Sequence, residues 1–333
     1  MALSKTILRA FFLIFLLLSL FGCYGHGDVR VLRLAHVLPV DHPVHKGMEY
    51  LAKRVDELSG GKLRIKIYPG GQLGSERECL ESLQIGSLDM TKVNSAVVEN
   101  FVPSVAVLSL PYLFSSTEHR WKVFNGEIGK QMLQDGEPFW LHGLCFYETG
   151  TRNFYLTKVP VYKPEDLRGL KIRVMRSHWS IESVKALGAS VTPIAFGELY
   201  AALAAGVVDG AENNIPTFYQ SRHWEICKYF VLDGHTAPSD MLLISTHTWK
   251  RLSDQEKDWL MKATKESVDY QRKLWYSAEN TYLDIMKKGG VQVIQPDTLA
   301  FKEKVKPLYE KLKQSHNFLY PLVEKIKQAD FGN

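Results

Sequence analysis

Strand-like and helix-like apolar patterns alternate along this chain, and this alternation constrains its fold more than any other feature. Apolar and polar residues alternate from Val31 to His36, and apolar residues then recur at helical spacing from about Val44 to Leu58. A second pair follows, with a strand pattern from Leu63 to Ile67 and a helix pattern from Glu76 to Ile85. Strands that alternate with helices usually form a parallel sheet covered by helices. The sequence therefore predicts an α/β fold with a parallel sheet.

The same alternation resumes in the second half of the chain. Its segments are a strand at Lys171 to Val174, a helix at Ser180 to Leu187, a strand at Ser190 to Pro193 and a helix at Glu198 to Ala205. A nearly Gly- and Pro-free stretch from Ser253 to Lys288 predicts one unusually long helix. These patterns predict a second α/β domain and a helix long enough to span both domains.

The first 22 residues have the pattern of an export signal. Lys5 and Arg9 precede an uncharged apolar run over residues 10–21, which is too short for a stable membrane-spanning helix. The run ends in the letters LFGC at Cys23, which resembles the bacterial lipobox, where the Cys becomes the lipidated first residue. We expect residues 1–22 to be a signal peptide that ends at a lipidated Cys23. Ordinary cleavage a few residues later is the alternative.

Composition and charge exclude several classes of protein. With 45% hydrophobic and 23% charged residues, the chain is typical of a globular protein. The formal charge of +5 falls to +3 without Lys5 and Arg9, because 39 basic residues then face 36 acidic ones. So small a bias, with no basic run interleaved with aromatic residues, argues against nucleic acid as a partner. No second segment is apolar enough to cross a membrane, so we expect a mature protein that is soluble or only tethered.

The four cysteines, Cys23, Cys79, Cys145 and Cys227, have no C-x-x-C spacing. If Cys23 is lipidated, at least one of the other three is unpaired. A bridge between Cys145 and Cys227 is chemically allowed in an oxidising compartment, but spacing cannot select a pairing. Buried free thiols are the preferred interpretation.

Catalytic and metal-binding motifs are missing from the sequence. It has no G-x-S-x-G, H-E-x-x-H, Walker or G-x-G-x-x-G motif. Ser59 and Lys62 match S-x-x-K by letter, but they lie where a helix must end. His36, His42 and His45 are close together, yet no carboxylate or Cys completes a recognisable ligand spacing. We expect no catalytic residues, no metal and no cofactor; a strand-end ligand contact is expected for His36, and helix-cap or surface roles for His42 and His45.

The region from Leu167 to Asn214 combines an arginine, an aromatic residue and an amide in a way that suits a small organic anion. Arg173 lies at the end of a predicted strand, and its planar guanidinium fits a carboxylate with two parallel hydrogen bonds. Phe196 and Asn213 follow at spacings that a βαβ alternation brings to the same edge of a sheet.

Nine motifs along the chain together resemble one protein family. They are L-R-L-A-H, D-H-P-V-H-K-G, Y-P-G-G-Q-L-G-S-E-R-E, G-S-L-D-M, L-P-Y-L-F, T-G-T-R-N-F-Y, G-L-K-I-R-V-M, A-F-G-E-L-Y-A-A-L and V-D-G-A-E-N-N. In this order they resemble the extracytoplasmic solute-binding proteins of TRAP transporters, over essentially the whole mature chain. A single motif of this kind is weak evidence, whereas nine in the family's order are strong.

The resemblance implies a set of ligand-binding residues. Arg173 matches the family's arginine that takes the ligand carboxylate in a two-pronged salt bridge, and Arg152 matches a second arginine of the site. Phe196 matches an aromatic residue that packs beside the ligand, and Asn213 matches an amide of the site. Residues that match first-domain contacts to the rest of the ligand are His36, Glu76 and Asn94. The structural alternatives are a core position for Phe196, a helix N-terminal charge for Glu76 and a turn position for Asn94.

The same resemblance implies a periplasmic-binding-protein fold, in which two α/β domains are joined by crossing strands and the long helix. We expect the first domain over residues 28–150 and about 239–278, and the second over residues 151–238 and about 279–333. The cleft between them would close over the ligand by a hinge motion. A monomeric periplasmic protein of this kind makes and breaks no bond. It hands its ligand to a permease of a small and a large membrane subunit, driven by an ion gradient.

The predicted ligand is a hexuronate such as glucuronate or galacturonate. Asn214, Pro216 and the segment from His223 to Phe230 resemble the family members that bind sugar acids, although Ile215 stands where those proteins commonly have a Trp. The many hydrogen-bonding side chains suit a polyhydroxylated monoacid, whereas a dicarboxylate should require more positive charge opposite Arg173. Another hydroxy, keto or dicarboxylic acid of four to six carbons is the alternative.

Two further function classes differ from transport. A sensor subunit would use the same fold to present its ligand to a receptor rather than to a permease. A secreted α/β hydrolase would need a positioned nucleophile and base, which the sequence does not offer. Neighbouring genes for a small and a large membrane protein would favour transport.

Overall fold

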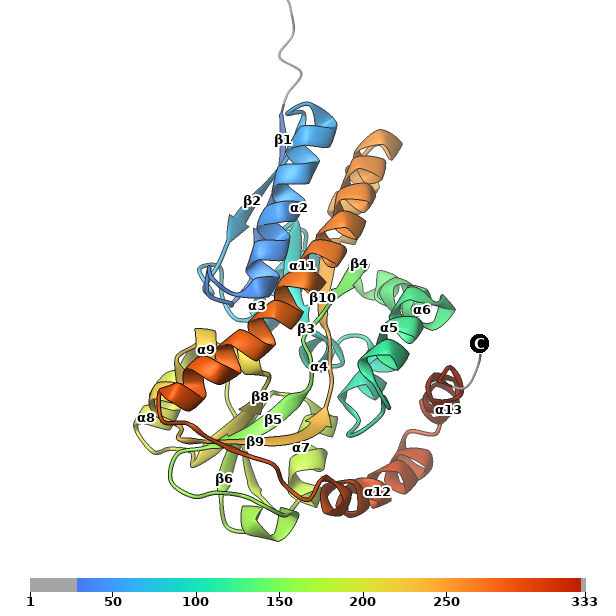
Figure 1. Ribbon diagram of the computed structural model, residues 1–333. Coiled ribbons are helices and arrows are strands. Elements are labelled where there is room, and N and C mark those ends of the chain that lie inside the picture. The colour runs from blue at the N-terminus through green and yellow to red at the C-terminus, as the bar shows by residue number, and fades with distance from the viewer. Residues whose placement is uncertain (1–28, 331–333) are drawn as a thin grey trace, which may run out of the picture.

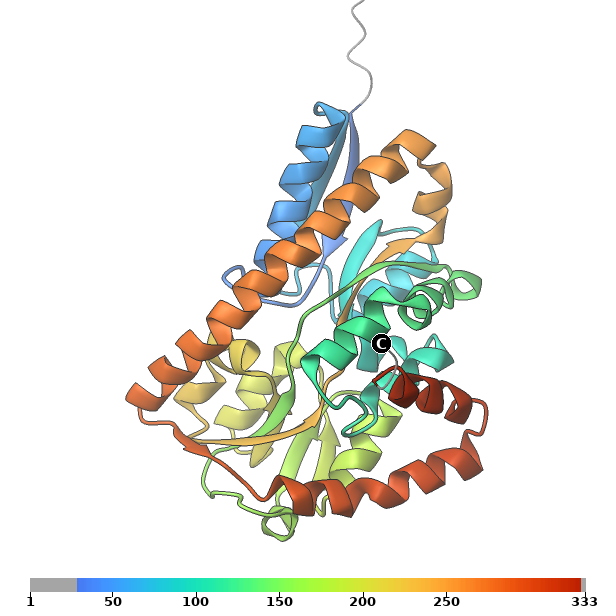
Figure 2. The same ribbon diagram turned by 45° about the vertical axis from the view of Figure 1, so that its right-hand side comes forward.

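The computed structural model describes residues 29–330, so the predicted signal peptide and the predicted lipidation at Cys23 lie outside the described residues. Two α/β domains are built around two separate sheets, and one long helix runs along both of them (Figures 1 and 2). Within residues 29–330, no helix has the combination of length and apolarity that a bilayer crossing requires. The predicted two-domain α/β architecture is confirmed.

The sheet of the first domain has five strands in the order β2-β1-β3-β10-β4. They are β1 (Arg30–Ala35), β2 (Leu63–Tyr68), β3 (Met90–Asn94), β4 (Leu141–Tyr147) and β10 (Asp240–Ser245). Strands β1, β2 and β3 are parallel, whereas β10 is antiparallel to both of its neighbours, β3 and β4. The prediction of a parallel sheet is wrong for β10, because this strand enters directly from the other domain and needs no crossover helix.

The sheet of the second domain has six strands in the order β11-β9-β5-β8-β6-β7. They are β5 (Arg152–Leu156), β6 (Lys171–Val174), β7 (Ser190–Pro193), β8 (Gly210–Asn213), β9 (Tyr229–Thr236) and β11 (Gln292–Ile294). Here β5 is the antiparallel strand, paired with β8 on one side and β9 on the other. Each sheet thus has one antiparallel strand, and in both cases it is the strand that follows a crossing between the domains.

Local sequence signals explain where the main helices begin and end. Helix α2 (Pro43–Ser59) starts after His42, whose ring accepts a hydrogen bond from the Val44 N–H, and it stops at Gly60, which has a left-handed φ of 60°. Helices α3 (Glu76–Gln84) and α11 (Asp254–Lys288) both start with a Ser–Glu capping box. The predicted helix-cap role of His42 and the predicted long helix are therefore confirmed.

The remaining helices are shorter and fill the connections. The α-helices are α4 (Ser95–Val98), α5 (Thr117–Asn125), α6 (Glu127–Gln134), α7 (His178–Ala186), α8 (Leu199–Ala204), α9 (Ile215–Gln220), α10 (Thr246–Arg251), α12 (Thr298–Ser315) and α13 (Tyr320–Gln328). The 3₁₀ turns are η1 (Pro103–Ser109), η2 (Glu137–Phe139), η3 (Pro164–Leu167), η4 (Phe196–Glu198) and η5 (His223–Glu225).

Three segments hold the two domains together. The chain crosses between the sheets from β4 to β5 and again from β9 to β10, and α11 packs against α2 of the first domain and α9 of the second. Gln271 of α11 fixes the first crossing, because its side-chain amide exchanges two 2.9 Å hydrogen bonds with the backbone N–H and C=O of Glu148. The C-terminal segment also contacts both domains, since α12 packs on the second core through Phe301 and α13 on the first through Val323 (Figure 2).

The three cysteines of the described chain are buried thiols without a disulfide partner. Cys145 lies on β4 of the first domain, whereas Cys227 precedes β9 of the second, so the bridge that spacing allowed is not formed. Burial raises the pKa of Cys79 to about 11 and that of Cys227 to about 12. The preferred interpretation as buried free thiols is confirmed for these three cysteines.

Candidate ligand-binding site

A cavity lies between the domains, where the carboxyl ends of β1, β3, β6 and β8 meet the amino ends of the crossing strands β5 and β10. This is the edge at which open α/β sheets bind ligands. The lining residues are Val37, Leu38, Glu76, Lys92, Asn94, Arg152, Arg173, Met175, Phe196, Asn213, Asn214, Thr217 and Asp240. They include seven of the eight residues that the sequence predicts for the site, all except His36. Towards the surface the cavity continues past Arg77, Asn100 and Arg176.

Arg173, on β6, is a buried cation whose hydrogen-bonding capacity is largely unused. Its side chain is 2% exposed, and its Nε donates to the carbonyl oxygen of Ile194 at 2.9 Å. Among the described residues no partner hydrogen-bonds to either Nη group. Burial, and the neighbouring positive charge of Arg152, lower the pKa of Arg173 from its ordinary value. A guanidinium held in this way is stabilised when an anion fills the cavity.

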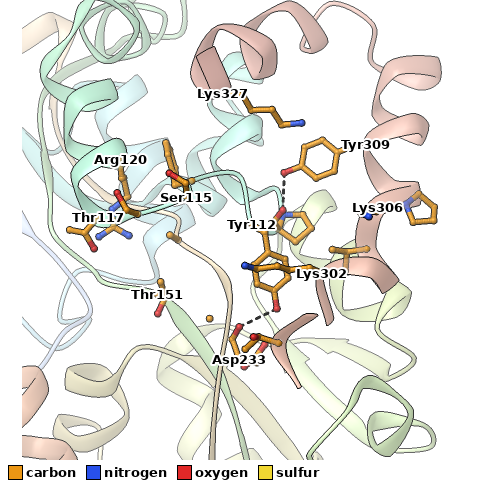
Figure 3. Close-up of a pocket in the computed structure, with 18 of the residues that line it drawn as sticks. Tyr112, Ser115, Thr117, Arg120, Thr151, Asp233, Lys302, Lys306, Tyr309 and Lys327 are labelled. Carbon is orange, nitrogen blue, oxygen red and sulfur yellow. Dashed lines mark hydrogen bonds between the residues drawn. The ribbon is translucent and has the colours of Figure 1, made fainter. Parts of the chain in front are cut away.

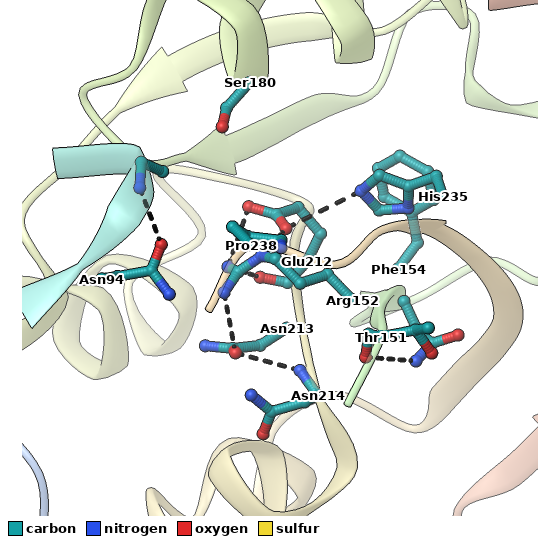
Figure 4. A network of polar contacts seen from close by, with 12 residues as sticks. Asn94, Thr151, Arg152, Phe154, Ser180, Glu212, Asn213, Asn214, His235 and Pro238 are labelled. Atoms are coloured by element: carbon teal, nitrogen blue, oxygen red, sulfur yellow. Dashed lines mark hydrogen bonds and ion pairs between the residues drawn. The ribbon is translucent and has the colours of Figure 1, made fainter. Parts of the chain in front are cut away.

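Arg152, on β5, is in contrast almost fully bound to the protein. Its guanidinium contacts both carboxylate oxygens of Glu212 on β8, and its Nη1 donates to Asn213 Oδ1 at 3.0 Å (Figure 4). Burial would raise the pKa of Glu212, but the charges of Arg152 and His235 outweigh burial and hold this pKa at about 2. Arg152 therefore balances Glu212 and positions Asn213, which leaves Arg173 as the better placed carboxylate partner.

The hydrogen-bond network fixes how the three amides of the site are oriented (Figure 4). Asn213 Oδ1 accepts from Arg152 and also from the Asn214 N–H at 2.9 Å, so its NH₂ group remains available as a donor. Asn214 Oδ1 accepts from the Thr217 N–H as the cap of α9, which leaves its NH₂ group available as well. Asn94 Oδ1 caps α4 in the same manner. The second-domain wall thus presents donors, which suit carboxylate and hydroxyl oxygens.

The first-domain wall contains two charged residues that sequence reasoning missed, Lys92 and Asp240. Lys92 Nζ lies 3.0 Å from Asp240 Oδ2 and 3.2 Å from Glu76 Oε1, and the Lys92 side chain is 2% exposed. Burial would lower the pKa of Lys92, but the two carboxylates raise it, so the ammonium stays charged. The sequence did contain a signal for this pair. Lys92 is the one charged residue of the strand Met90–Asn94, and a charge inside a buried strand requires a partner.

His36 lies beneath the cavity rather than in its lining. Its Nε2 is 2.9 Å from His45 Nδ1, and its Nδ1 accepts from the backbone N–H of Leu38, a lining residue. Burial, followed by the charge of Lys92, lowers the pKa of His36 to about 2, so the ring is neutral. Direct ligand contact by His36 stays a prediction. His45 is 3% exposed, so a surface role for it is wrong, and its Nε2 contacts Glu49.

Phe196 lies in η4 and is partly buried, where it lines the inner and the outer part of the cavity and packs against the core of the opposite domain. It therefore bridges the two walls at the cavity entrance. Its alternative place in a core is partly realised, whereas its predicted place beside the ligand stays a prediction.

A second, larger cavity opens on the other side of the crossing segments (Figure 3). Tyr112, Thr151, Asp233 and lysines of α12 line it, and the Tyr112 hydroxyl donates to the Asp233 carbonyl oxygen at 3.1 Å. Thr151 faces this cavity while the next residue, Arg152, faces the first one. None of the eight predicted residues lines the larger cavity, so the cavity around Arg173 is the candidate site.

Comparisons with known proteins identify the family. The family model described as bacterial extracellular solute-binding protein, family 7, matches residues 34–315. A TRAP periplasmic solute-binding protein from Bradyrhizobium sp. BTAi1, solved with galacturonate, is 40% identical, with a TM-score of 0.86 over 90% of this chain and 100% of that one.

Two other solved structures agree. A TRAP solute-binding protein from Chromohalobacter salexigens with D-glucuronate is 32% identical, with a TM-score of 0.87 over 90% of this chain and 99% of that one. A Polaromonas protein with D-erythronate is 30% identical, with a TM-score of 0.86 over 89% and 98%. The chain therefore belongs to the family 7 extracellular solute-binding proteins, the periplasmic ligand-binding components of TRAP transporters, and is a transport component rather than an enzyme.

Proposed function

We propose that this protein captures a hexuronate, glucuronate or galacturonate, in the periplasm and delivers it to a TRAP permease made of a small and a large membrane subunit. The observation that carries the proposal is Arg173, a buried arginine whose two Nη groups have no hydrogen-bond partner among the described residues and whose side chain lines the interdomain cavity. A single carboxylate matches this fork in charge and in geometry.

The rest of the cavity supports a polyhydroxylated ligand. The NH₂ groups of Asn213 and Asn214 stand available beside Arg173, and Glu76 and Asn94 line the opposite wall. A ligand with one carboxylate and several hydroxyls can satisfy these groups, whereas an aliphatic acid would leave several of them desolvated without a partner. The galacturonate and glucuronate bound by the two relatives belong to this class of monoacid. D-erythronate, bound by a third, makes a shorter hydroxy acid the second candidate.

Closure of the cleft supplies the mechanism. Two domains would move relative to each other, the first over residues 28–150 and about 239–278, the second over residues 151–238 and about 279–333. The two crossings between the sheets, at residues 148–151 and 237–239, support the division at those points. Helix α13 packs on the first core through Val323, so it would move with the first domain. The ligand contacts both walls only when they are close together, so it favours the closed form. That form docks on the permease, or on a receptor if the protein is a sensor.

Lipidation of Cys23 and a monomeric state are two further proposed properties of the protein. Lipidation of Cys23 would tether the mature chain to the membrane beside its permease, and mass spectrometry of the membrane fraction tests it. The monomeric state predicted from the sequence is the second property. Sedimentation at micromolar concentration tests that property.

The experiment for the ligand is calorimetry and thermal unfolding with uronates, aldonates, keto acids and dicarboxylates. A ligand at a hundred times its Kd should add about 2.7 kcal/mol to the free energy of unfolding, which corresponds to a Tm rise of several degrees. Arg173→Ala should abolish the shift while the unliganded Tm changes little, because the variant removes the anion partner and leaves both cores intact. Arg168→Ala, an exposed arginine of the same domain, is the matched control. Unchanged affinity in Arg173→Ala, or no response to any uronate, would overturn the proposal.

A further inference from the structure

The first-domain wall of the cavity has a polar arrangement that the carboxylate site does not explain. Glu76, Lys92 and Asp240 are brought together from α3, β3 and β10, and all three line the cavity. We propose that this triad selects polyhydroxylated monoacids by hydrogen-bonding the hydroxyl groups at the far end of the ligand and by repelling any acid that carries a second carboxylate there. This inference rests on the proposed function, since it takes Arg173 as the partner of the first carboxylate.

A count of hydrogen bonds shows what the triad has left to offer. The Lys92 ammonium has three N–H donors, and Asp240 and Glu76 take two of them. Glu76 Oε1 accepts from Lys92 and from the Asn94 N–H at 3.1 Å, whereas no donor among the described residues binds Glu76 Oε2. Both oxygens of Asp240 are engaged, by Lys92 and by the Asn94 amide at 3.1 Å. The triad therefore has one donor left, on Lys92, and one carboxylate oxygen, Glu76 Oε2, that accepts no hydrogen bond from the described residues.

A hydroxyl group is the ligand group that matches this combination, because it donates and accepts at once. Two neighbouring hydroxyls on a sugar can give one hydrogen bond to Glu76 Oε2 and take one from Lys92 Nζ. A chain without hydroxyls would bury both groups unsatisfied, which costs more than a missing contact on an exposed surface.

The charges of the two walls are opposite. One ammonium and two carboxylates give the first-domain triad a net charge of −1, whereas Arg152, Arg173 and Glu212 give the second-domain wall a net charge of +1. Other nearby ionisable groups do not change this sum. His36 and His42 have depressed pKa values and are neutral, and His235 is paired with Asp233.

Two more arginines line the outer part of the cavity, but they lie where solvent screens them. Arg77 is paired with Glu81, and Arg176 is exposed. A ligand whose carboxylate binds Arg173 therefore has its other end against a negative wall. Like charges brought together in a desolvated site are strongly unfavourable, so a second carboxylate is rejected at that end.

The test compares acids that differ in one group. Galactonate and galactarate share a six-carbon chain and the same hydroxyl configuration, but galactarate has a carboxylate where galactonate has a CH₂OH. Calorimetry of the full mature chain should give a Kd for galactarate at least about tenfold above that for galactonate. Hexanoate, a monoacid of the same length without hydroxyls, should bind more weakly than galactonate by a similar factor or more.

Isosteric neutralisation of the wall then tests the cause. Glu76→Gln and Asp240→Asn each raise the net charge of the triad by one, and each should lower the galactarate-to-galactonate Kd ratio at least about threefold. Thermal unfolding without ligand checks that each variant is folded. If one variant does not fold, the other provides the test. Equal affinities for the two acids in the wild type, a ratio unchanged in both folded variants, or no binding of either open-chain acid would overturn the inference. Galacturonate is included because its failure to bind would overturn the proposed function instead.

Discussion

Arg152 and Glu212 are paired inside the second domain, where the guanidinium of one contacts both carboxylate oxygens of the other and both side chains are at most 5% exposed. Because each charge is the main partner of the other, the pair carries structure, whereas Arg173 has capacity left for a ligand. The two arginines of the site therefore have different roles, and their variants should fail in different ways.

Replacement of Arg152 should damage the fold first. Arg152→Met leaves the buried carboxylate of Glu212 without its partner, and breaking a buried ion pair in this way costs about 3–5 kcal/mol. Urea unfolding of the unliganded protein measures the loss. The double variant Arg152→Met with Glu212→Gln should recover part of it, because the uncompensated charge is gone. Normal stability combined with lost affinity in Arg152→Met would show that this arginine is a ligand group after all.

Stability should fall on the alkaline side because of His235. Burial disfavours the charged ring, but Asp233, at the other end of a hydrogen bond from Nδ1, outweighs burial and raises the pKa of His235 to about 9. The folded protein thus holds this proton more tightly than the unfolded chain. The resulting stabilisation, on the order of 2–3 kcal/mol, is complete below pH 6.5 and is lost as pH rises towards 9. Urea unfolding between pH 6 and 9.5 measures it, and His235→Asn should flatten the curve.

Glu99 should make the free energy of unfolding depend on pH in a lower pH range than His235 does. Burial raises the pKa of this carboxyl to about 7, although hydrogen bonds from Ser177 and Ser109 oppose the rise. The folded protein prefers the protonated form, so the free energy of unfolding should decrease as pH rises from about 4.5 to 7, by on the order of 2–3 kcal/mol. Glu99→Gln keeps the shape and removes the titration. If the wild type and Glu99→Gln differ equally at pH 5 and pH 8, the carboxyl is not the cause.

Gly47 is a point of close approach between α2 and the long helix α11. A Cβ atom at this position would lie 2.7 Å from Gln271 Cβ, on the same side chain that holds the Glu148 backbone. Gly47→Ala should therefore cost about 1–3 kcal/mol of stability through overpacking, even though alanine favours helix. Gly197→Ala, where a Cβ meets no atom within 4 Å, is the control. Thermal unfolding measures the Tm of both variants, and equal Tm values would contradict the expected overpacking at Gly47.

The sequence predicted most of the helices and parallel strands because their signals are local. Helix α11 follows from a Gly-poor stretch and a capping box, and β6 and β7 have the expected ends. The reversed direction of β10 could not be predicted in the same way, since its neighbours on β3 and β4 lie about 100 to 150 residues earlier in the chain.

The site shows the same division between local and distant signals. Arg173 and Asn213 lie within motifs that a reader of the sequence can recognise, so their place at the cavity was predictable. Lys92 becomes a site residue only because Asp240, 148 residues later, supplies its counter-charge. Nothing in either local segment reveals that pairing, and the role of Glu212 as the partner of Arg152 was missed for the same reason.

The antiparallel strand in each sheet has a consequence for the order in which the molecule can be made. Strand β10 lies between β3 and β4, so the first sheet has a gap between these two strands until residue 245 has been synthesised, after most of the second sheet. A fragment that stops at residue 150 would expose the unpaired edges of β3 and β4 to other chains. The first domain can therefore complete its sheet only after nearly three quarters of the polypeptide has been made.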